Sequence, residues 1–204
     1  MRIGNKNERN RCNPRIPHLV LLFLALNVWP LFGLDRDIVI STYQGSCRDG
    51  DFAANLAVVR ENIRLALERK SDFVVFPETF LSGYDTREKV MKGARRIDDP
   101  EIAALIAESA GQGIVILVGL ARIAEEGVYN SVLVISGGRL LGIYDKVMLT
   151  EGDADELKFM PGRDVPVFEA GGVRFAVNIC HDTSFPHLAL IAKMNGAELL
   201  FTPH

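Results

Sequence analysis

The sequence predicts a mixed α/β domain, because short apolar segments typical of buried strands alternate with amphipathic helical segments. The first unit contains a β-branched strand at 37–43, a helix at 52–70 and an apolar strand at 72–76. Asp51 precedes the helix as a candidate N-cap, and apolar side chains recur through Leu67 at helical spacing. Strand, helix and strand in this order predict a parallel βαβ unit.

The middle of the chain continues the same alternation. A second helix is predicted at 100–110 and a buried strand at 114–118. Two further strands, 129–135 and 139–144, flank Ser136-Gly137-Gly138, and Gly-Gly between two β-rich runs predicts a hairpin. The polar, acidic stretch 150–156 is expected to be a loop.

The last third of the chain predicts another strand–helix–strand unit. Its strands are expected at 173–179 and 197–201. The helix between them spans 185–195, with Pro186 near its start, where proline is tolerated.

Composition narrows the possible functions. The 204 residues suit one sizeable domain, and the net charge of −3 arises from interspersed acids and bases, so no nucleic-acid partner is expected. Cys12, Cys47 and Cys180 are odd in number and far apart, which indicates neither a disulfide framework nor a Cys-x-x-Cys site. This cysteine usage predicts a reducing, cytoplasmic location.

Residues 1–35 differ from the predicted domain at 36–204. Basic residues through Arg15 precede an uncharged, apolar run at 16–34, as in a signal peptide or a membrane anchor. Pro17 and Asn27 interrupt the run, and no Ala-x-Ala-like cleavage site follows it. We therefore favour a leader that is dispensable for the working protein. Export or membrane anchoring through 16–34 is the alternative, and membrane contact is expected only if this leader is an anchor.

Three candidate catalytic residues, Glu78, Lys146 and Cys180, each follow an apolar strand within one or two residues. Taken singly, each is more commonly structural: a surface acid, a solvated lysine or a core thiol. However, ligands bind beyond the carboxyl ends of strands in open α/β sheets, so these three strand ends are expected to meet in one crevice.

The three side chains make chemical sense together. A thiol with a pKa of ~8.5 needs a base or a cation to become a nucleophile. Glu78 could take the proton of Cys180 as the sulfur attacks a carbonyl or nitrile carbon, and could later activate water to release the thioester. Lys146 would favour the thiolate and stabilise the anionic tetrahedral intermediate.

His181 is a weaker candidate for the base. Neighbouring residues on a strand point to opposite faces, so His181 is not expected to reach the Cys180 sulfur. A metal site built from Cys180, His181 and Asp182 is less favoured still, because contiguous ligands rarely complete a tetrahedron.

Four motifs together resemble the nitrilase, or carbon–nitrogen hydrolase, superfamily, and the resemblance covers about residue 37 to the end. The motifs are Phe76-Pro-Glu-Thr-Phe-Leu-Ser-Gly-Tyr84, Tyr144-Asp-Lys-Val-Met-Leu149, Phe159-Met-Pro-Gly162 and Asn178-Ile-Cys-His-Asp-Thr-Ser-Phe-Pro186. The resemblance implies a four-layer α-β-β-α sandwich that assembles as a homodimer or higher homo-oligomer, and no cofactor or metal. It also implies a triad of Glu78 as base, Lys146 as oxyanion stabiliser and Cys180 as nucleophile, with the backbone amide of His181 helping to hold the oxyanion.

The sequence departs from the family pattern in three places. A further family glutamate is expected before the Pro-Gly, where this chain has Asp155, with Glu156 one residue off. Ser184-Phe-Pro-His187 replaces the Arg-Phe-Pro-Glu of many amidase-type members. Family domains also continue for several strands and helices beyond Phe201, so the resemblance implies a C-terminally truncated domain.

The expected function is hydrolysis of a non-peptide carbon–nitrogen bond in a small amide or N-carbamoyl compound, through a thioester acyl-enzyme. His181-Asp182 after the cysteine differs from the Trp-Glu common in true nitrilases. The alternatives are a membrane-anchored acyltransferase of the same superfamily, and an inactive, truncated sandwich that serves as an interaction module.

Overall fold

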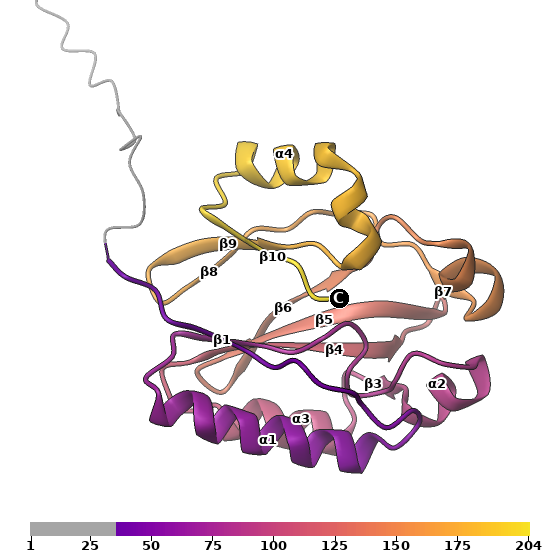
Figure 1. Cartoon of the computed structure of the whole chain (residues 1–204), viewed down its shortest axis with the longest axis horizontal. Helices are drawn as coiled ribbons and strands as arrows, with labels where there is room; N and C mark the ends of the chain where they lie inside the picture. The colour runs from indigo at the N-terminus through magenta and orange to yellow at the C-terminus, as the bar shows by residue number, and fades with distance from the viewer. Residues whose placement is uncertain (1–35) are drawn as a thin grey trace, which may run out of the picture. The chain divides into compact units, whose positions relative to one another are not determined.

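The computed structural model describes residues 36–204, which form four layers in the order helix, sheet, sheet, helix (Figure 1). The helices are α1 (Phe52–Glu68), α2 (Arg87–Gly93), α3 (Pro100–Glu108) and α4 (Pro186–Met194), with a π-helical turn η1 (Gly152–Glu156) and a 3₁₀ turn η2 (Cys180–Ser184). The larger sheet contains β1 (Ile40–Thr42), β2 (Phe73–Val75), β3 (Arg95–Arg96), β4 (Val115–Ile123), β5 (Val128–Ser136), β6 (Arg139–Asp145) and β7 (Phe159–Met160). The smaller sheet contains β8 (Phe168–Ala170), β9 (Val173–Val177) and β10 (Leu199–Phe201).

Strand directions bring the predicted strand ends to one edge of the larger sheet. The sheet has the order β1-β2-β4-β5-β6, with β1, β2 and β4 parallel and β5 antiparallel to both β4 and β6. Two reversals make β6 run in the same direction as β2. Consequently, the carboxyl ends of β2 and β6 lie on the same side, and the predicted βαβ unit and hairpin are both confirmed.

Side chains along each strand point alternately to the two faces of the sheet, and this alternation explains the layering. In β2, Phe73 packs in the core between the two sheets, whereas Val74 packs against the helices α1 and α3. In the smaller sheet, Phe175 faces the inter-sheet core and Ala176 packs with Ala192 of α4. Each sheet therefore has two buried faces, which accounts for the nearly continuous apolar runs in these strands.

Two helical segments differ from the sequence-based expectation, and the short strands β3, β7 and β8 were not predicted either. The stretch 150–156, expected to be a loop, contains the turn η1. The helix α2 was not predicted, because it is only seven residues long and carries few apolar side chains. Thr86 caps it, and its buried Val90 packs in a cluster with Ala121 of β4, so tertiary contact stabilises it.

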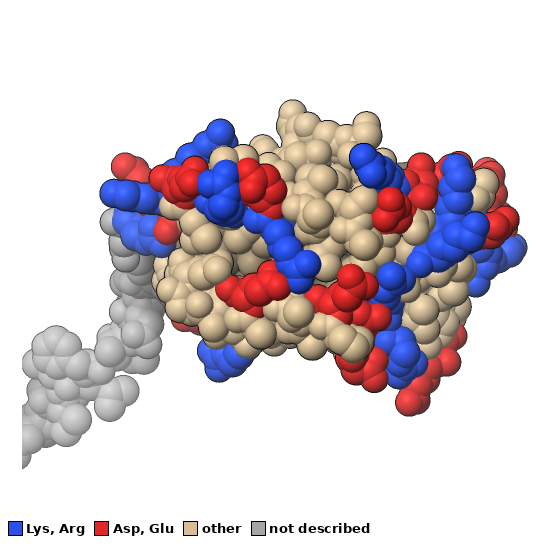
Figure 2. Space-filling view, turned by 90° about the horizontal axis from the view of Figure 1, so that it is seen from below, with Lys and Arg blue, Asp and Glu red and all other residues tan. Residues whose placement is uncertain are grey.

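The side of the domain that carries α1 and α3 shows interspersed positive and negative side chains (Figure 2). Arg60 of α1 makes a bidentate contact with Glu108 of α3, and Arg64 pairs with Glu61 and Glu68 within α1. These two arginines of α1 are thus partnered by neighbouring acids. Between residues 36 and 204, no helix is long and apolar enough to cross a membrane. The predicted leader at 1–35 lies outside the described residues.

Candidate active site

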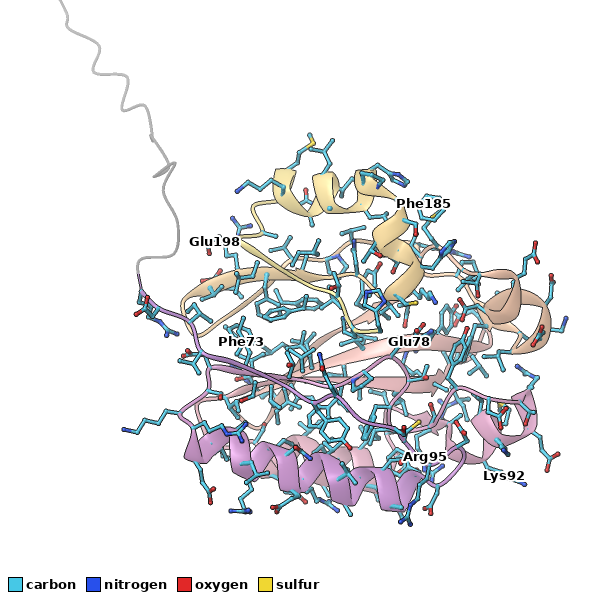
Figure 3. All side chains as sticks on the ribbon, in the orientation of Figure 1. Phe73, Glu78, Lys92, Arg95, Phe185 and Glu198 are labelled. Atoms are coloured by element: carbon cyan, nitrogen blue, oxygen red, sulfur yellow. The ribbon has the colours of Figure 1, made fainter. Side chains whose placement is uncertain are left out.

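Glu78 and Lys146, predicted to meet from separate strand ends, are in direct contact. Glu78 follows β2 and Lys146 follows β6, and the Lys146 Nζ lies 2.7 Å from the Glu78 Oε1. Figure 3 shows Glu78 between the two sheets, on the side where the chain ends. Proximity of these two strand ends therefore follows from the sheet topology.

Lys146 is a buried cation held between two carboxylates. Its side chain is 1% exposed, and its Nζ lies 2.7 Å from both Glu78 Oε1 and Asp153 Oδ2. Burial acts to lower the pKa of Lys146, but the two carboxylates outweigh burial and raise it. Lys146 therefore stays protonated and fixed in position.

Asp153, which the sequence analysis missed, occupies the place expected for Asp155 or Glu156. The Asp153 side chain is fully buried, whereas Asp155 and Glu156 are exposed. Burial opposes the ionised form, but the hydrogen bonds from Lys146 and Thr150 lower the pKa of Asp153. The structure thus brings Asp153 to Lys146 and leaves the two expected acids, Asp155 and Glu156, at the surface.

A local motif could have identified Asp153. The main-chain N–H of Thr150 donates to Asp153 Oδ2 at 2.9 Å, and the N–H of Asp153 donates to Thr150 Oγ1 at 3.1 Å. This is the reciprocal pattern of a capping box, which Thr-x-x-Asp at 150–153 resembles. The capping pair starts a helical turn that aims Asp153 at Lys146. Tyr84 Oη donates to the other oxygen, Oδ1, at 2.9 Å.

Cys180 lies at the start of η2 in a left-handed backbone conformation, with a φ of 44°. Its main-chain N–H donates to the carbonyl oxygen of Pro203 at 2.9 Å, while the N–H of Glu78 donates to that of His204 at 3.4 Å. Consecutive carbonyls of 203–204 thus tie the main chains of Cys180 and Glu78 together. A non-glycine residue at positive φ is strained, and such strain is common where a side chain is presented for chemistry.

Without substrate, the surroundings of Cys180 favour the thiol over the reactive thiolate. Burial raises its pKa, and the negative charge of Glu78 raises it further, whereas Lys146 lowers it. The expectation that Lys146 favours the thiolate gives the correct direction for its own effect, but Glu78 and burial outweigh it. Cys180 consequently needs a base at the moment of attack.

His181 lies in η2 with Cys180, because the strand β9 ends at Val177. The argument from strand alternation therefore does not apply to this pair. Its ring packs edge-on against Phe185, with centroids 5.2 Å apart. The contact turns this imidazole toward the start of α4.

Asp182 fixes the turn that carries Cys180. Its buried carboxylate accepts hydrogen bonds from Tyr144 Oη at 2.7 Å, from the N–H of Met148 at 2.7 Å and from the N–H of Ile179 at 2.9 Å. These donors flank Lys146 and precede Cys180, so Asp182 joins the two segments.

Across residues 36–204, no group of three His, Cys, Asp or Glu side chains is placed to hold a metal ion.

Asn130 of β5 is a second residue that the sequence analysis missed. It is fully buried and donates from Nδ2 to Glu78 Oε1 at 2.7 Å. The signal in the sequence is a single amide between Val128 and Val132 in a strand that is otherwise mostly apolar. Such a buried amide requires a partner.

The fold and the site define a class of protein: a two-sheet α/β domain in which a partly buried thiol lies near a carboxylate–lysine pair. The chain belongs to the carbon–nitrogen hydrolase family, whose sequence profile matches residues 39–204.

Individual relatives are identical to this chain at about a third of the aligned residues. The chain is 32% identical to an N-carbamoylputrescine amidase of Arabidopsis thaliana over 179 residues, which cover 84% of this chain and 60% of the relative. It is 33% identical to a glutamine-dependent NAD(+) synthetase of Thermotoga maritima over 136 residues, 65% of this chain and 23% of the relative.

A solved structure supports the same placement. A carbon–nitrogen hydrolase superfamily protein of Xanthomonas campestris, with an arsenic adduct in its active site, matches with a TM-score of 0.66 and 31% identity. The match covers 74% of this chain and 56% of that one. The chain thus spans at most 60% of the length of these three proteins.

Proposed function

We propose that this domain hydrolyses a non-peptide carbon–nitrogen bond of a small amide or N-carbamoyl compound, with Cys180 as nucleophile. The observation that carries the proposal is the buried contact between Glu78 and Lys146 beside a strained, protonated thiol. A carboxylate base, a fixed cation and a nucleophile are the three groups that acyl transfer to a thiol requires.

In the proposed first half-reaction, Glu78 takes the proton of the Cys180 thiol while the sulfur bonds to the carbonyl carbon. The carbonyl oxygen becomes an oxyanion, which Lys146 and the main-chain N–H of His181 stabilise. The oxyanion then collapses, the carbon–nitrogen bond breaks, and Glu78 returns the proton to the departing ammonia or amine. The product is a Cys180 thioester.

In the second half-reaction, Glu78 removes a proton from water, whose oxygen attacks the thioester carbon. Collapse of the second tetrahedral intermediate breaks the carbon–sulfur bond, and Glu78 returns the proton to the Cys180 sulfur. Asp153 serves as the second acid: it does not touch the reacting atoms but holds Lys146 in position, together with Glu78. Asp155 and Glu156 have no role in this mechanism.

The names of the relatives suggest which substrates to test. One relative is named for N-carbamoylputrescine and another for glutamine, and both compounds carry a terminal amide-type nitrogen.

Cys47 and Cys180 are free thiols, which supports reaction in the cytoplasm. Export or anchoring through 16–34 remains the alternative location.

We also propose that the domain works as a homodimer or higher homo-oligomer. Leu190, Ile191 and Met194 of α4 are exposed, Met194 by 77%, and side chains of this type are usually buried in assemblies. Light scattering after size exclusion should give at least twice the chain mass, and Met194→Glu should shift the protein toward monomer. A monomeric wild-type protein would contradict this part of the proposal.

The catalytic proposal is tested by incubating the full chain with N-carbamoylputrescine, glutamine, simple amides and nitriles. Wild type should release ammonia or amine, and intact mass should show an acyl adduct that Cys180→Ala cannot form. If folded wild type releases no more ammonia or amine than Cys180→Ala, the result would favour an interaction module instead. Acyl transfer to an added amine or alcohol in preference to water would favour the acyltransferase alternative.

A further inference from the structure

We propose that Asn130 is a positioning residue that directs one oxygen of Glu78 toward Cys180. This inference rests on the proposed role of Glu78 as the base. Asn130 touches neither the nucleophile nor, in the proposed mechanism, the substrate. It acts through the orientation of the Glu78 carboxylate.

The first observation is that Asn130 bonds to both residues of the Glu78–Lys146 ion pair. Its side-chain Nδ2 donates to Glu78 Oε1 at 2.7 Å. Its main-chain carbonyl accepts from the N–H of Lys146 at 2.8 Å. One residue of β5 therefore links the segment after β2 to the segment after β6.

The second observation is that two donors share one oxygen of Glu78. Lys146 Nζ and Asn130 Nδ2 both contact Oε1, each at 2.7 Å, and neither of these bonds uses Oε2. A carboxylate held by one lysine can still rotate about that contact. Two donors from different strands fix its plane, which leaves Oε2 to accept a proton from Cys180.

The third observation is that one hydrogen-bonding atom of the Asn130 side chain has no partner between residues 36 and 204. It is fully buried, and its Oδ1 has no hydrogen-bond partner among the described residues. By contrast, the buried Asn55 uses its side chain to bind main-chain atoms of Arg48 and Leu81. A buried amide oxygen without a partner destabilises the fold, so the benefit of Asn130 is expected in the site.

The first test does not depend on activity. Asn130→Leu keeps a similar side-chain shape but removes the donor, and it is combined with Glu78→Gln in a double-mutant cycle of urea unfolding. We expect the effects to be coupled by a factor of about 5 or more in the unfolding equilibrium constant. Independent effects would show that Asn130 only fills space and would overturn the inference.

The second test uses ammonia release from whichever compound of the panel wild type hydrolyses. Asn130→Leu should lower kcat about 10-fold to 100-fold and change KM by less than about 3-fold, because only the alignment of the base is lost. Asn130→Asp should recover activity as the pH falls, since the introduced carboxyl can again donate once it is protonated. Ser131→Ala, the neighbouring buried residue that bonds Asp145, should change neither parameter.

The outcomes separate the two proposals. If kcat is unchanged in Asn130→Leu, or if Asn130→Asp shows no recovery at low pH, the positioning role is wrong even if the hydrolase is active. If the unfolding cycle shows coupling but wild type hydrolyses nothing, the Asn130–Glu78 link stands and the proposed function fails.

Discussion

The main chain of Glu78 lies directly on Gly119 of β4. A Cβ at position 119 would be 2.9 Å from the Glu78 carbonyl carbon and 2.4 Å from the nitrogen of Thr79. The adjoining Thr79 has a φ of 46°, so the turn that carries the base is strained as well as tightly packed. Glycine at 119 therefore lets this turn rest on the sheet.

Gly119→Ala should displace Glu78 and lower both stability and turnover. Overpacking costs about 1–3 kcal/mol, and a shift of about 1 Å at a catalytic group can lower the rate ~100-fold. Urea unfolding and ammonia release measure the two effects. Gly142→Ala is the control, because its Cβ would lie 2.7 Å from the Phe168 ring, a side chain of the core. It should destabilise the fold without a comparable loss of turnover by the folded protein.

Cys180→Gly should be more stable than Cys180→Ala by about 1 kcal/mol, although neither can form an acyl adduct. The reason is the φ of 44°, which glycine adopts without strain and alanine does not. Urea unfolding of the two variants checks the difference. An alanine variant of equal or greater stability would show that the turn carries no strain.

Glu78→Gln should make Cys180 more reactive toward iodoacetamide at neutral pH while abolishing amide hydrolysis. The negative charge of Glu78 raises the pKa of Cys180 and Lys146 lowers it, so neutralising Glu78 lowers that pKa and increases the thiolate fraction. Turnover should still fall at least ~100-fold, because the base is lost.

Peptide mass spectrometry measures this alkylation, with Cys47 as the internal reference. A rise at Cys47 as well would indicate general unfolding. A Cys180 that reacts no faster in Glu78→Gln than in wild type would contradict the electrostatic contact between the two residues.

Asp153→Asn should lower the free energy of unfolding by about 3 kcal/mol, because the buried Lys146 loses one of its two counter-charges. Asp155→Asn, a neighbouring exposed acid, should change it by less than about 0.5 kcal/mol. The pKa of Asp153 is lowered in the folded protein, so its contribution is present above the unfolded pKa of ~3.9 and is lost on acidification.

Urea unfolding at a series of pH values tests both statements. The difference between wild type and Asp153→Asn should shrink as the pH falls below about 4. If Asp155→Asn has the larger effect, the sequence-based place of the second acid would be correct after all.

The sequence by itself determined the fold class and predicted that the ends of three strands carry the candidate site. Periodicity and β-branched runs predicted α1, α3, α4 and the strands around them, because local preference and burial agree in those segments. Glu78, Lys146 and Cys180 were predicted as candidates because a strand end is visible in a sequence as an apolar run that stops at a polar residue.

Only the tertiary structure decided which residues complete the site. Asp153 and Asn130 belong to it through contacts with Lys146 and Glu78, at separations of 7 and 52 residues. Lys146 and Asp153 do not share a helix or strand, and neither do Glu78 and Asn130, so periodicity within one element predicts neither contact. Likewise, the raised pKa of Cys180 depends on burial and on the balance of two opposite charges nearby. Such balances arise from distances in space, which a linear pattern of residues does not contain.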